Sequence, residues 1–384
     1  MCRPAGRRCV GDAGLVDPSI HAMTVIRVGL RERSYPIYVA DSYRHLPQIL
    51  ARQRLGPLLA VVSHRRLLDR FGGELLKTLR RGGLTVITMT VPESELSKSS
   101  RVAQRLLTQL ARRATMRLPV LVAFGGGVVG DLTGFVAAVF RRGVPYVQLP
   151  TTLLAQVDSS IGGKVGIDLP EAKNAVGAFY QPRVVFDHVG VLRSLPLRQR
   201  RSGLAEILKY AVMADAWLFR FLERHVTACL HGNPQVDRVM VERCARIKAR
   251  VVSRDERETR GVRTRLNLGH TLGHALEAAT GYRRFTHGEA IAVGLAYASH
   301  LSVTQGLMAT AARQRIIRLL RALGLPTAVT GVSLGAVKRA LRYDKKFIRG
   351  KSRWVLPTQI GRAIVTEGVP MSEAMRLMRE YVKP

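Results

Sequence analysis

The chain has few cysteines and no long apolar run, and both shortages narrow the class of protein. Its four cysteines, Cys2, Cys9, Cys229 and Cys244, include no Cys-x-x-Cys pair and are too sparse for a disulfide framework, which indicates a reducing compartment. Charge-free stretches such as 143–157 fall short of the roughly 18 apolar residues of a membrane span. We therefore expect a cytoplasmic protein without a membrane partner.

Acidic residues are scarce as well. The chain has 61 lysines and arginines against 27 aspartates and glutamates, which gives a net charge of +34. Such a balance raises the question of nucleic-acid binding. However, the basic residues are scattered, with no block longer than three and no aromatic residues between them. A generally basic surface is the simpler interpretation, and no specific nucleic-acid partner is expected.

The chain divides into three regions. Residues 1–22 show no apolar or periodic pattern, so a disordered extension is expected rather than a signal peptide. In residues 23–187, apolar strand-like runs alternate with amphipathic stretches such as 65–80 and 100–113, which is typical of an α/β domain with a parallel sheet. The expected strands are a hairpin at 24–30 and 35–39, then 58–62, 86–91, 120–124, 145–149 and 184–187.

The third region, residues 188–384, repeats apolar residues at helical spacing as far as residue 342. This pattern predicts an all-helical C-terminal domain. Residues 354–366 are an exception, since their two apolar pieces either pair as a small hairpin or lie extended. The domain boundary is expected near residues 183–195, and no internal repeat is visible.

A glycine-rich segment follows one expected strand. Residues 125–131 read Gly-Gly-Gly-Val-Val-Gly-Asp and precede a helical stretch at 132–141. Glycines let the backbone approach a phosphate, and the N–H groups at a helix start favour an anion. The segment departs from the ordinary Rossmann fingerprint, because it follows a late strand and lacks the later acidic residue. A tight turn that only requires glycine is the alternative.

A second segment is rich in small polar groups. Residues 150–164 combine hydroxyl side chains, Asp158 and a terminal Gly-Gly-Lys, and Lys173-Asn174 follows nine residues later. Hydroxyls, paired glycines and lysines suit a phosphorylated or carboxylated sugar better than they suit a core.

The helical region contains the metal-ligating residue types. Glu206 and Lys209 lie three apart on one helix face, where a surface ion pair is the alternative reading. His270 and His274 are spaced i and i+4, so both can face one metal ion, and His287 follows closely. With Glu206 in the same domain, a zinc or iron site of the His/His/carboxylate type is predicted.

Lysine is rare, since only 11 of the 61 basic residues are lysines and 50 are arginines. A chain with this bias retains lysine where a compact ammonium donor is required and a planar guanidinium does not fit. Anionic ligands such as phosphate and carboxylate meet that description. The lysines beside Gly, Asn, His or acidic residues are Lys98, Lys164, Lys173, Lys209, Lys248, Lys345 and Lys346.

Together, residues 125–131, 150–164, 173–179 and 266–275 resemble the 3-dehydroquinate synthase family. The resemblance extends from about residue 24 to the C-terminus. It implies a homodimer with an N-terminal NAD-binding domain built on a Rossmann-like parallel sheet and an all-helical, metal-binding C-terminal domain. The implied reaction converts 3-deoxy-D-arabino-heptulosonate 7-phosphate to 3-dehydroquinate and phosphate, by oxidation, phosphate elimination, reduction and intramolecular aldol closure.

The resemblance also implies site residues. Zinc, or cobalt(II) in its place, is expected on Glu206, His270 and His287, which leaves His274 facing the substrate. NAD is expected to contact Glu95, Lys98, Gly127, Val128, Val129, Gly130, Asp131, Thr151, Thr152, Lys164, Lys173, Val191, Leu192, Arg193 and Ser194. The phosphorylated sugar acid is expected to contact Asp158, Lys164, Asn174, Lys209, Lys248, Arg263, Asn267, His274 and one or both of Lys345 and Lys346. Arg142 is expected to come from the other subunit.

Two positions depart from the family pattern. Family members commonly place an acid and an asparagine after the strand at 58–62 to bind the adenosine ribose, whereas Ser63, His64 and Arg65 stand here. Asp168 stands where asparagine is usual. The alternatives to this family are sister sugar-phosphate cyclases, group III metal-dependent alcohol dehydrogenases and a protein that binds nucleic acid through charge alone.

Overall fold

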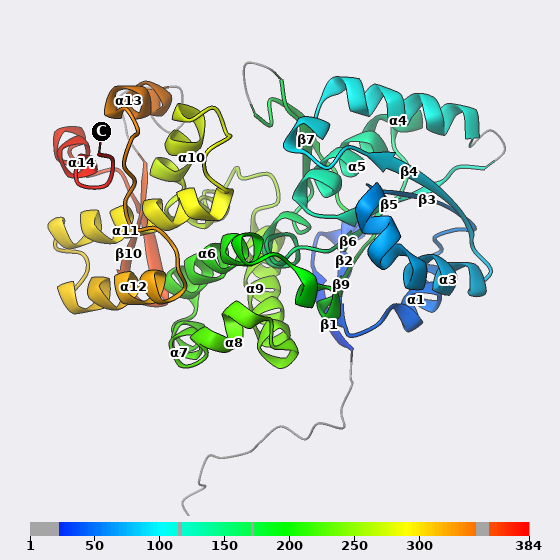
Figure 1. The fold of residues 1–384 in the computed structure, drawn as a ribbon, viewed down its shortest axis with the longest axis horizontal. Helices are drawn as coiled ribbons and strands as arrows, with labels where there is room; N and C mark the ends of the chain where they lie inside the picture. Colours follow the sequence, from blue (N-terminus) through cyan, green and yellow to red (C-terminus); the bar gives the residue numbers. More distant parts are fainter. Residues whose placement is uncertain (1–22, 114–116, 170–172, 343–352, 384) are drawn as a thin grey trace, which may run out of the picture.

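The computed structural model describes residues 23–113, 117–169, 173–342 and 353–383, and it has two halves side by side (Figure 1). One half is built on a seven-stranded sheet, and the other is mainly helical. The expected extension at 1–22 and the candidate substrate residue Lys345 lie outside the described residues. Among the described residues, no helix combines the length and apolar character that crossing a membrane requires.

The sheet has the strand order β1-β2-β9-β6-β5-β3-β4. β1 and β2 form an antiparallel hairpin, and every other neighbouring pair is parallel. This arrangement confirms the predicted hairpin and α/β class. The strands are β1 (Thr24–Val28), β2 (Tyr35–Ala40), β3 (Leu58–His64), β4 (Thr85–Val91), β5 (Val120–Gly125), β6 (Tyr146–Pro150) and β9 (Val184–His188).

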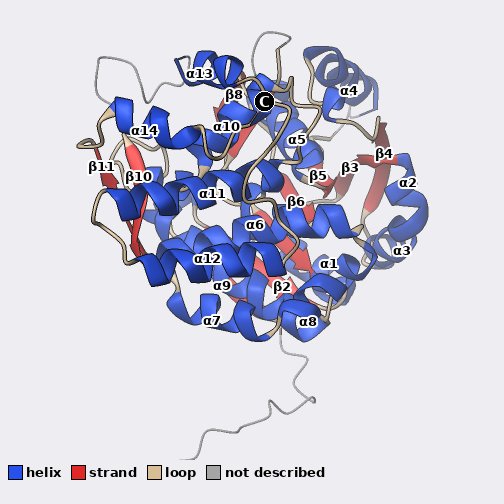
Figure 2. Cartoon of the chain, turned by 60° about the vertical axis from the view of Figure 1, so that its left-hand side comes forward, coloured by secondary structure: helices blue, strands red, loops and turns tan. Residues whose placement is uncertain are grey.

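Helices cover both faces of the sheet, which is why its central strands are apolar throughout (Figure 2). On one face, α4 (Ser100–Arg113) and α5 (Gly127–Val139) pack their leucines on β3 and β5. On the other face, α1 (Leu46–Arg52) and α3 (Gly73–Arg81) pack around Phe124. The core of this half is therefore a three-layer sandwich.

Two helices differ from expectation. The helix predicted at 65–80 is divided into α2 (Arg65–Leu67), the π-helical turn η3 (Leu68–Gly72) and α3. The division falls where Gly72 and Gly73 offer little helical propensity. The helix predicted at 132–141 begins earlier, at Gly127, so residues 127–131 of the glycine-rich segment form the start of α5 and Gly126 is its N-cap.

The second half confirms the predicted helical region and contains one small hairpin. The hairpin pairs β10 (Trp354–Gln359) with β11 (Arg362–Thr366). Three short helical elements, η6 (Ala155–Ser159), η7 (Val189–Ser194) and η8 (Arg263–Asn267), border the helical half. Its helices are α6 (Leu197–Ala214), α7 (Ala216–Arg224), α8 (Val226–His231), α9 (Pro234–Arg254), α10 (His270–Ala279), α11 (His287–Thr304), α12 (Thr310–Ala322), α13 (Leu334–Arg342) and α14 (Met371–Met378).

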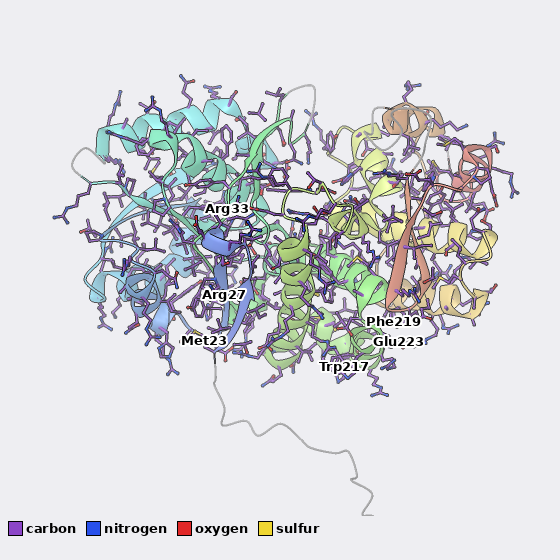
Figure 3. The ribbon with its side chains drawn as sticks, turned by 180° about the vertical axis from the view of Figure 1, so that it is seen from behind. Met23, Arg27, Arg33, Trp217, Phe219 and Glu223 are labelled. Carbon is purple, nitrogen blue, oxygen red and sulfur yellow. The ribbon has the colours of Figure 1, made fainter. Side chains whose placement is uncertain are left out.

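A continuous apolar core joins the two halves. Ile37 of β2 and Val185 of β9 belong to the same buried cluster as Leu204 and Leu208 of α6. Seen from behind, the β1–β2 hairpin with Arg27 lies beside α9, and α7 with Trp217 lies further along (Figure 3). The domain boundary expected between residues 187 and 188 stays a prediction.

A further hairpin was not predicted. β7 (Lys164–Ile167) and β8 (Val176–Phe179) pair antiparallel and hold the Gly-Gly-Lys sequence at their start. The strands have only four residues each and include two glycines, so they carry no clear alternation. Lys164 is the first residue of β7 and follows the π-helical turn that carries Asp158 by five residues.

The close approach of α10 and α11 depends on glycine. A Cβ on Gly294 of α11 would lie 1.8 Å from the carbonyl oxygen of Gly269, which precedes α10. We predict that Gly294→Ala lowers the free energy of unfolding by at least about 2 kcal/mol, because backbone must move to admit the methyl group. Urea unfolding measures this loss.

The matched control is Gly73→Ala in α3, where nothing lies within 4 Å of the added Cβ. Alanine there should leave stability unchanged or raise it. Equal stabilities of the two variants would contradict the packing argument.

Candidate active site

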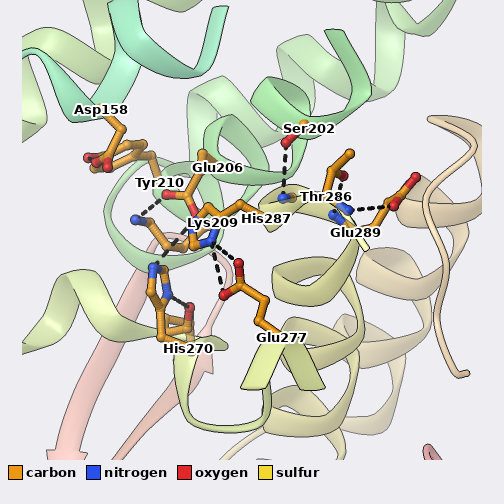
Figure 4. A network of polar contacts seen from close by, with 12 residues as sticks. Asp158, Ser202, Glu206, Lys209, Tyr210, His270, Glu277, Thr286, His287 and Glu289 are labelled. Atoms are coloured by element: carbon orange, nitrogen blue, oxygen red, sulfur yellow. Dashed lines mark hydrogen bonds and ion pairs between the residues drawn. The ribbon is translucent and has the colours of Figure 1, made fainter. Parts of the chain in front are cut away.

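Glu206, His270 and His287 come from three helices and point toward one another (Figure 4). The Nε2 atoms of His270 and His287 lie 3.8 and 3.6 Å from Oε1 of Glu206. Ligand atoms around a tetrahedral zinc lie about 3.3 Å apart, so the spacing suits a divalent metal ion. Glu206 is fully buried, and its Oε1 accepts no hydrogen bond from the described residues. An atom of this kind is available to a metal.

The opposite ring nitrogens of both histidines face acceptors. Nδ1 of His270 lies 3.1 Å from the Leu268 carbonyl, and Nδ1 of His287 lies 3.4 Å from both carboxylate oxygens of Glu277. Such contacts hold a proton on Nδ1 and direct Nε2 toward Glu206, where a metal ion would displace any proton that Nε2 carries. A second set, His274 with Glu277 and His287, also has metal-site spacing. Because Glu277 already serves His287 as an acceptor, we infer that Glu206 is the carboxylate ligand.

The charges around this cluster favour a cation. Burial lowers the pKa of His270 well below its usual value, and the Lys209 charge adds to that shift, so the ring is neutral. Burial raises the pKa of the Glu206 carboxyl, but Lys209 and His287 outweigh it and the pKa is lowered. For His287, burial is outweighed by the Glu206 and Glu277 carboxylates, which raise its pKa to about 10. The surroundings of the Glu206 and Glu277 carboxylates therefore favour positive charge.

Asp158 links the cluster to the sheet half. It lies in η6 and accepts a hydrogen bond from the Tyr210 hydroxyl. Nζ of Lys248 donates both to the Asp158 carboxylate and to the Asp158 main-chain carbonyl, at 2.7 Å in each case. Burial raises the pKa of Asp158, but Lys248 and Lys209 reverse the shift and hold the pKa well below its usual value. Asp158 is thus an ionised acceptor that positions Lys248 beside Lys209, which is ion-paired with Glu206.

The glycine-rich turn between β5 and α5 forms a cradle that side chains would fill. A Cβ on Gly126 would lie 3.1 Å from Cγ2 of Thr152, and one on Gly127 would lie 3.0 Å from Oγ of Ser159. No side chain caps the N-terminus of α5. Its first N–H groups, beside Thr151 and Thr152, therefore suit the pyrophosphate of a dinucleotide.

A polar network lies next to this cradle. Nζ of Lys98 lies 2.7 Å from Oδ2 of Asp131 in α5 and also donates to the Asn174 amide oxygen. The backbone N–H of Asn174 donates in turn to Asp168, at 2.7 Å. The aspartate at position 168 thus orders the loop that carries Asn174.

Lys173 connects the two halves. Its Nζ lies 2.9 Å from Oε1 of Glu95 and 4.5 Å from the centre of the Tyr282 ring. Tyr282 belongs to the loop between α10 and α11, so this contact crosses from the sheet half to the loop that joins the helices of His270 and His287.

Three further substrate candidates, Lys164, Arg263 and Asn267, lie close together. Nζ of Lys164 lies 2.5 Å from Glu258, whose other oxygen accepts a hydrogen bond from Asn267 at 3.3 Å. Arg263 is buried and donates to main-chain carbonyls, including that of Gly162 at 3.1 Å. The fold therefore brings lysine, arginine and asparagine donors to one place.

Several other predicted site residues make fewer contacts with the Glu206 cluster. His274 is exposed, with its ring centre 5.0 Å from that of His270. Val191–Ser194 belong to η7 at the end of β9. Arg142 is exposed at a φ of +64°, and no contact among the described residues joins it to the cluster. The roles of all these residues stay predictions.

Sequence reasoning missed Glu277, Tyr210 and Glu258. Glu277 had a signal, because it stands at i+7 from His270 and so lies on the same face of α10. Tyr210 directly follows Lys209 but carries no pattern of its own. Glu258 lies in the charged run 254–260, which looks like any solvated loop.

Comparison with known proteins agrees with this geometry. A family model described as 3-dehydroquinate synthase N-terminal matches residues 88–202, and one described as 3-dehydroquinate synthase C-terminal matches residues 203–347. A 3-dehydroquinate synthase of Pelotomaculum thermopropionicum is 42% identical over 349 residues, covering 90% of this chain and 94% of the relative. One of Symbiobacterium thermophilum is 44% identical over 352 residues, covering 88% and 96%. The chain belongs to the 3-dehydroquinate synthase family. The resemblance read from the sequence is thereby confirmed.

Solved structures confirm the fold class. A 2-epi-5-epi-valiolone synthase from Streptomyces hygroscopicus, with NAD+ and Zn2+ bound, is 26% identical, with a TM-score of 0.83 and coverage of 92% of this chain and 98% of that one. A 2-deoxy-scyllo-inosose synthase has the same TM-score at 23% identity, covering 93% and 100%. An iron-containing alcohol dehydrogenase from Thermotoga maritima shares the fold more distantly, with a TM-score of 0.65 at 16% identity, covering 94% and 99%.

The departure from the family pattern lies at the end of β3 in this family member, because the strand extends to His64 and not only to the predicted residue 62. Ser63 is fully buried, and its Oγ makes no hydrogen bond with the described residues. His64 turns its Nδ1 toward the carbonyl of Val91, at 3.3 Å. Neither residue carries the carboxylate common at this point in the family.

We predict that Glu277→Ala lowers the affinity for zinc by about 10- to 100-fold, because Nδ1 of His287 loses the acceptor that fixes its tautomer. Competition with a chromogenic chelator measures the dissociation constant. Glu223→Ala is the control, since Glu223 of α7 pairs with Arg315 of α12 at 2.6 Å and belongs to neither candidate metal set. Equal zinc affinity in the Glu277 variant and the wild type would refute the role of Glu277.

Proposed function

We propose that this chain is a 3-dehydroquinate synthase that converts 3-deoxy-D-arabino-heptulosonate 7-phosphate to 3-dehydroquinate and phosphate. The observation that carries the proposal is the meeting of the Glu206, His270 and His287 set with buried Lys209 and Lys248 in a member of this family. This substrate requires a metal ion to polarise the hydroxyl that is oxidised. It also requires ammonium groups to bind its phosphate and its carboxylate.

The proposed cofactors are NAD and zinc, with cobalt(II) as an alternative ion. The cradle at Gly126 and Gly127 and the unpaired Glu206 oxygen fit these groups, and the related cyclases were solved with NAD+ and Zn2+ or NAD+ and Co2+. Once bound, they supply a Lewis acid and a reversible hydride acceptor.

The chain's own residues bind and orient the substrate. Lys209 keeps Glu206 ionised, and Asp158 holds Lys248 in place for an anionic group. Lys164 is neutralised by Glu258, so an incoming phosphate or carboxylate competes with that glutamate for the ammonium group. Asn267 is held by the same glutamate and donates to substrate oxygens beside the metal ligands.

We also propose a homodimer and a cytoplasmic location. Arg142 is exposed, and no contact among the described residues joins it to the Glu206 cluster of the same chain, so its guanidinium is suited to bind substrate in the partner subunit's site. Cys229 and Cys244 are buried and free of disulfides, which agrees with a reducing compartment.

The central prediction is stoichiometric phosphate release from the heptulosonate phosphate in the presence of NAD+ and zinc. No net NADH should accumulate, because one hydride leaves and one returns in each turnover. A phosphate assay run beside nicotinamide absorbance tests both parts. Steady accumulation of NADH would instead assign the chain to the dehydrogenases.

Two sugar phosphates without a carboxylate serve as controls. Glucose 6-phosphate and sedoheptulose 7-phosphate should react at least about a hundredfold more slowly, since the cationic groups lose their carboxylate partner. A preference for either sugar would place the chain among the sister cyclases.

A pH profile tests Lys248. Burial lowers its pKa to about 8, with Arg263 adding to the shift and Asp158 opposing it. The ammonium form exists below this pKa, so kcat/KM should fall as the pH rises through about 8. Lys248→Arg, which stays charged, should move the falling limb to higher pH on its residual activity. A falling limb at the same pH in both proteins would exclude Lys248 as its origin.

A further inference from the structure

Two arginines are buried among the residues whose burial the structure describes, although the chain has 50. Arg263 belongs to the candidate substrate residues beside Lys164 and Asn267. Arg200 does not, and it is only 2% exposed. Withdrawing a guanidinium from water costs free energy that its contacts must offset, so its place in the fold requires an explanation.

Arg200 lies in the second turn of α6 and contacts three other elements. Its Nη1 and Nη2 donate to the two carboxylate oxygens of Asp237 in α9, at 2.7 and 3.0 Å. Nη1 also donates to the carbonyl of Cys229 in α8, at 3.2 Å, and Nη2 to that of Leu192, at 2.8 Å. One planar group thus joins η7, α8 and α9 to the helix that carries Glu206.

The space for this group is built into the backbone. Gly232 follows α8 with a φ of +74°, and a Cβ there would lie 2.7 Å from Nη2 of Arg200. The Leu192 carbonyl lies near the end of η7 and also accepts the N–H of Leu195, at 3.1 Å. The guanidinium therefore serves as a second donor to a carbonyl that ends a helical turn.

We propose that Arg200 is a positioning residue that holds Val189–Ser194 against α6 and α9, and thereby shapes the part of the NAD site formed by this segment. The segment follows β9 at the carboxyl ends of the parallel strands, where ligands bind in open α/β sheets. The inference rests on the proposed function, because it takes NAD as the molecule bound there.

Stability alone does not account for this arrangement. Apolar residues of similar volume often replace a buried ion pair without loss of stability. They cannot, however, donate to the Leu192 carbonyl. Arg200→Met combined with Asp237→Leu therefore separates positioning from stability, because it removes both charges together and leaves no unpaired ion.

The experiment compares this double variant with the wild type and with Arg315→Met, which breaks a two-contact ion pair with Glu223 far from η7. NAD+ affinity is measured by calorimetry on the zinc-loaded protein, and amide hydrogen exchange is followed in Val189–Ser194. We expect an approximately tenfold higher Kd for NAD+ and faster exchange in the segment, with an unchanged unfolding midpoint. Arg315→Met should match the wild type in both measurements.

Unchanged affinity and exchange in the double variant would overturn the positioning role and leave the proposed function intact. A wild-type protein that does not bind NAD+ would overturn the function and this inference with it. If the double variant fails to fold, Arg200→Lys is measured in the same way, since it keeps the charge but loses the fork. Wild-type Kd and exchange in Arg200→Lys would equally overturn the role of Arg200.

Discussion

The carboxylate of Glu206 is completely buried, and its negative charge has to be balanced by cations within a few ångströms. Lys209, one turn along the same helix, supplies one of them. Nε2 atoms of His270 and His287 face the carboxylate from two further helices. Because Glu277 stands behind His287 as a second carboxylate, this corner of the molecule holds more negative charge than its lysine balances. The pKa of His287, raised to about 10, shows the same preference for positive charge, which a divalent metal ion on the three ligands would meet in place of that proton.

The three helices that surround the Glu206 carboxylate, α6, α10 and α11, have to pack closely. A Cβ on Gly288 of α11 would lie 2.2 Å from the carbonyl oxygen of Ser202 in α6, and Gly294 of the same helix meets Gly269 before α10. Side chains at these two glycines would separate the helices by more than the metal site tolerates, since ligand atoms must stay about 3.3 Å apart. The packing and the chemistry therefore depend on the same close contacts.

Buried lysines and buried arginines occupy different hydrogen-bonding geometries in this structure. Lys98, Lys209 and Lys248 each place one ammonium group where a carboxylate and other acceptors converge. Arg200 and Arg263 instead span acceptors that lie apart, most of them main-chain carbonyls. A compact rotatable head suits the first geometry and a rigid planar fork the second. An arginine-rich chain thus retains lysine at buried positions where a carboxylate and other acceptors converge on a single donor group.

Local patterns in the sequence determined the strands of the sheet and the limits of α4, because burial on both faces requires continuous apolar runs and an amphipathic helix repeats with a period of 3.6. They also indicated histidine and glutamate as metal ligands, and the family resemblance indicated Glu206, His270 and His287 among them. The hairpin of β7 and β8 was decided only by tertiary structure, since four-residue strands with glycine carry no alternation. The contact of Lys164 with Glu258 joins residues 94 positions apart. No local periodicity encodes such a contact, because it exists only when the two halves of the chain have packed together.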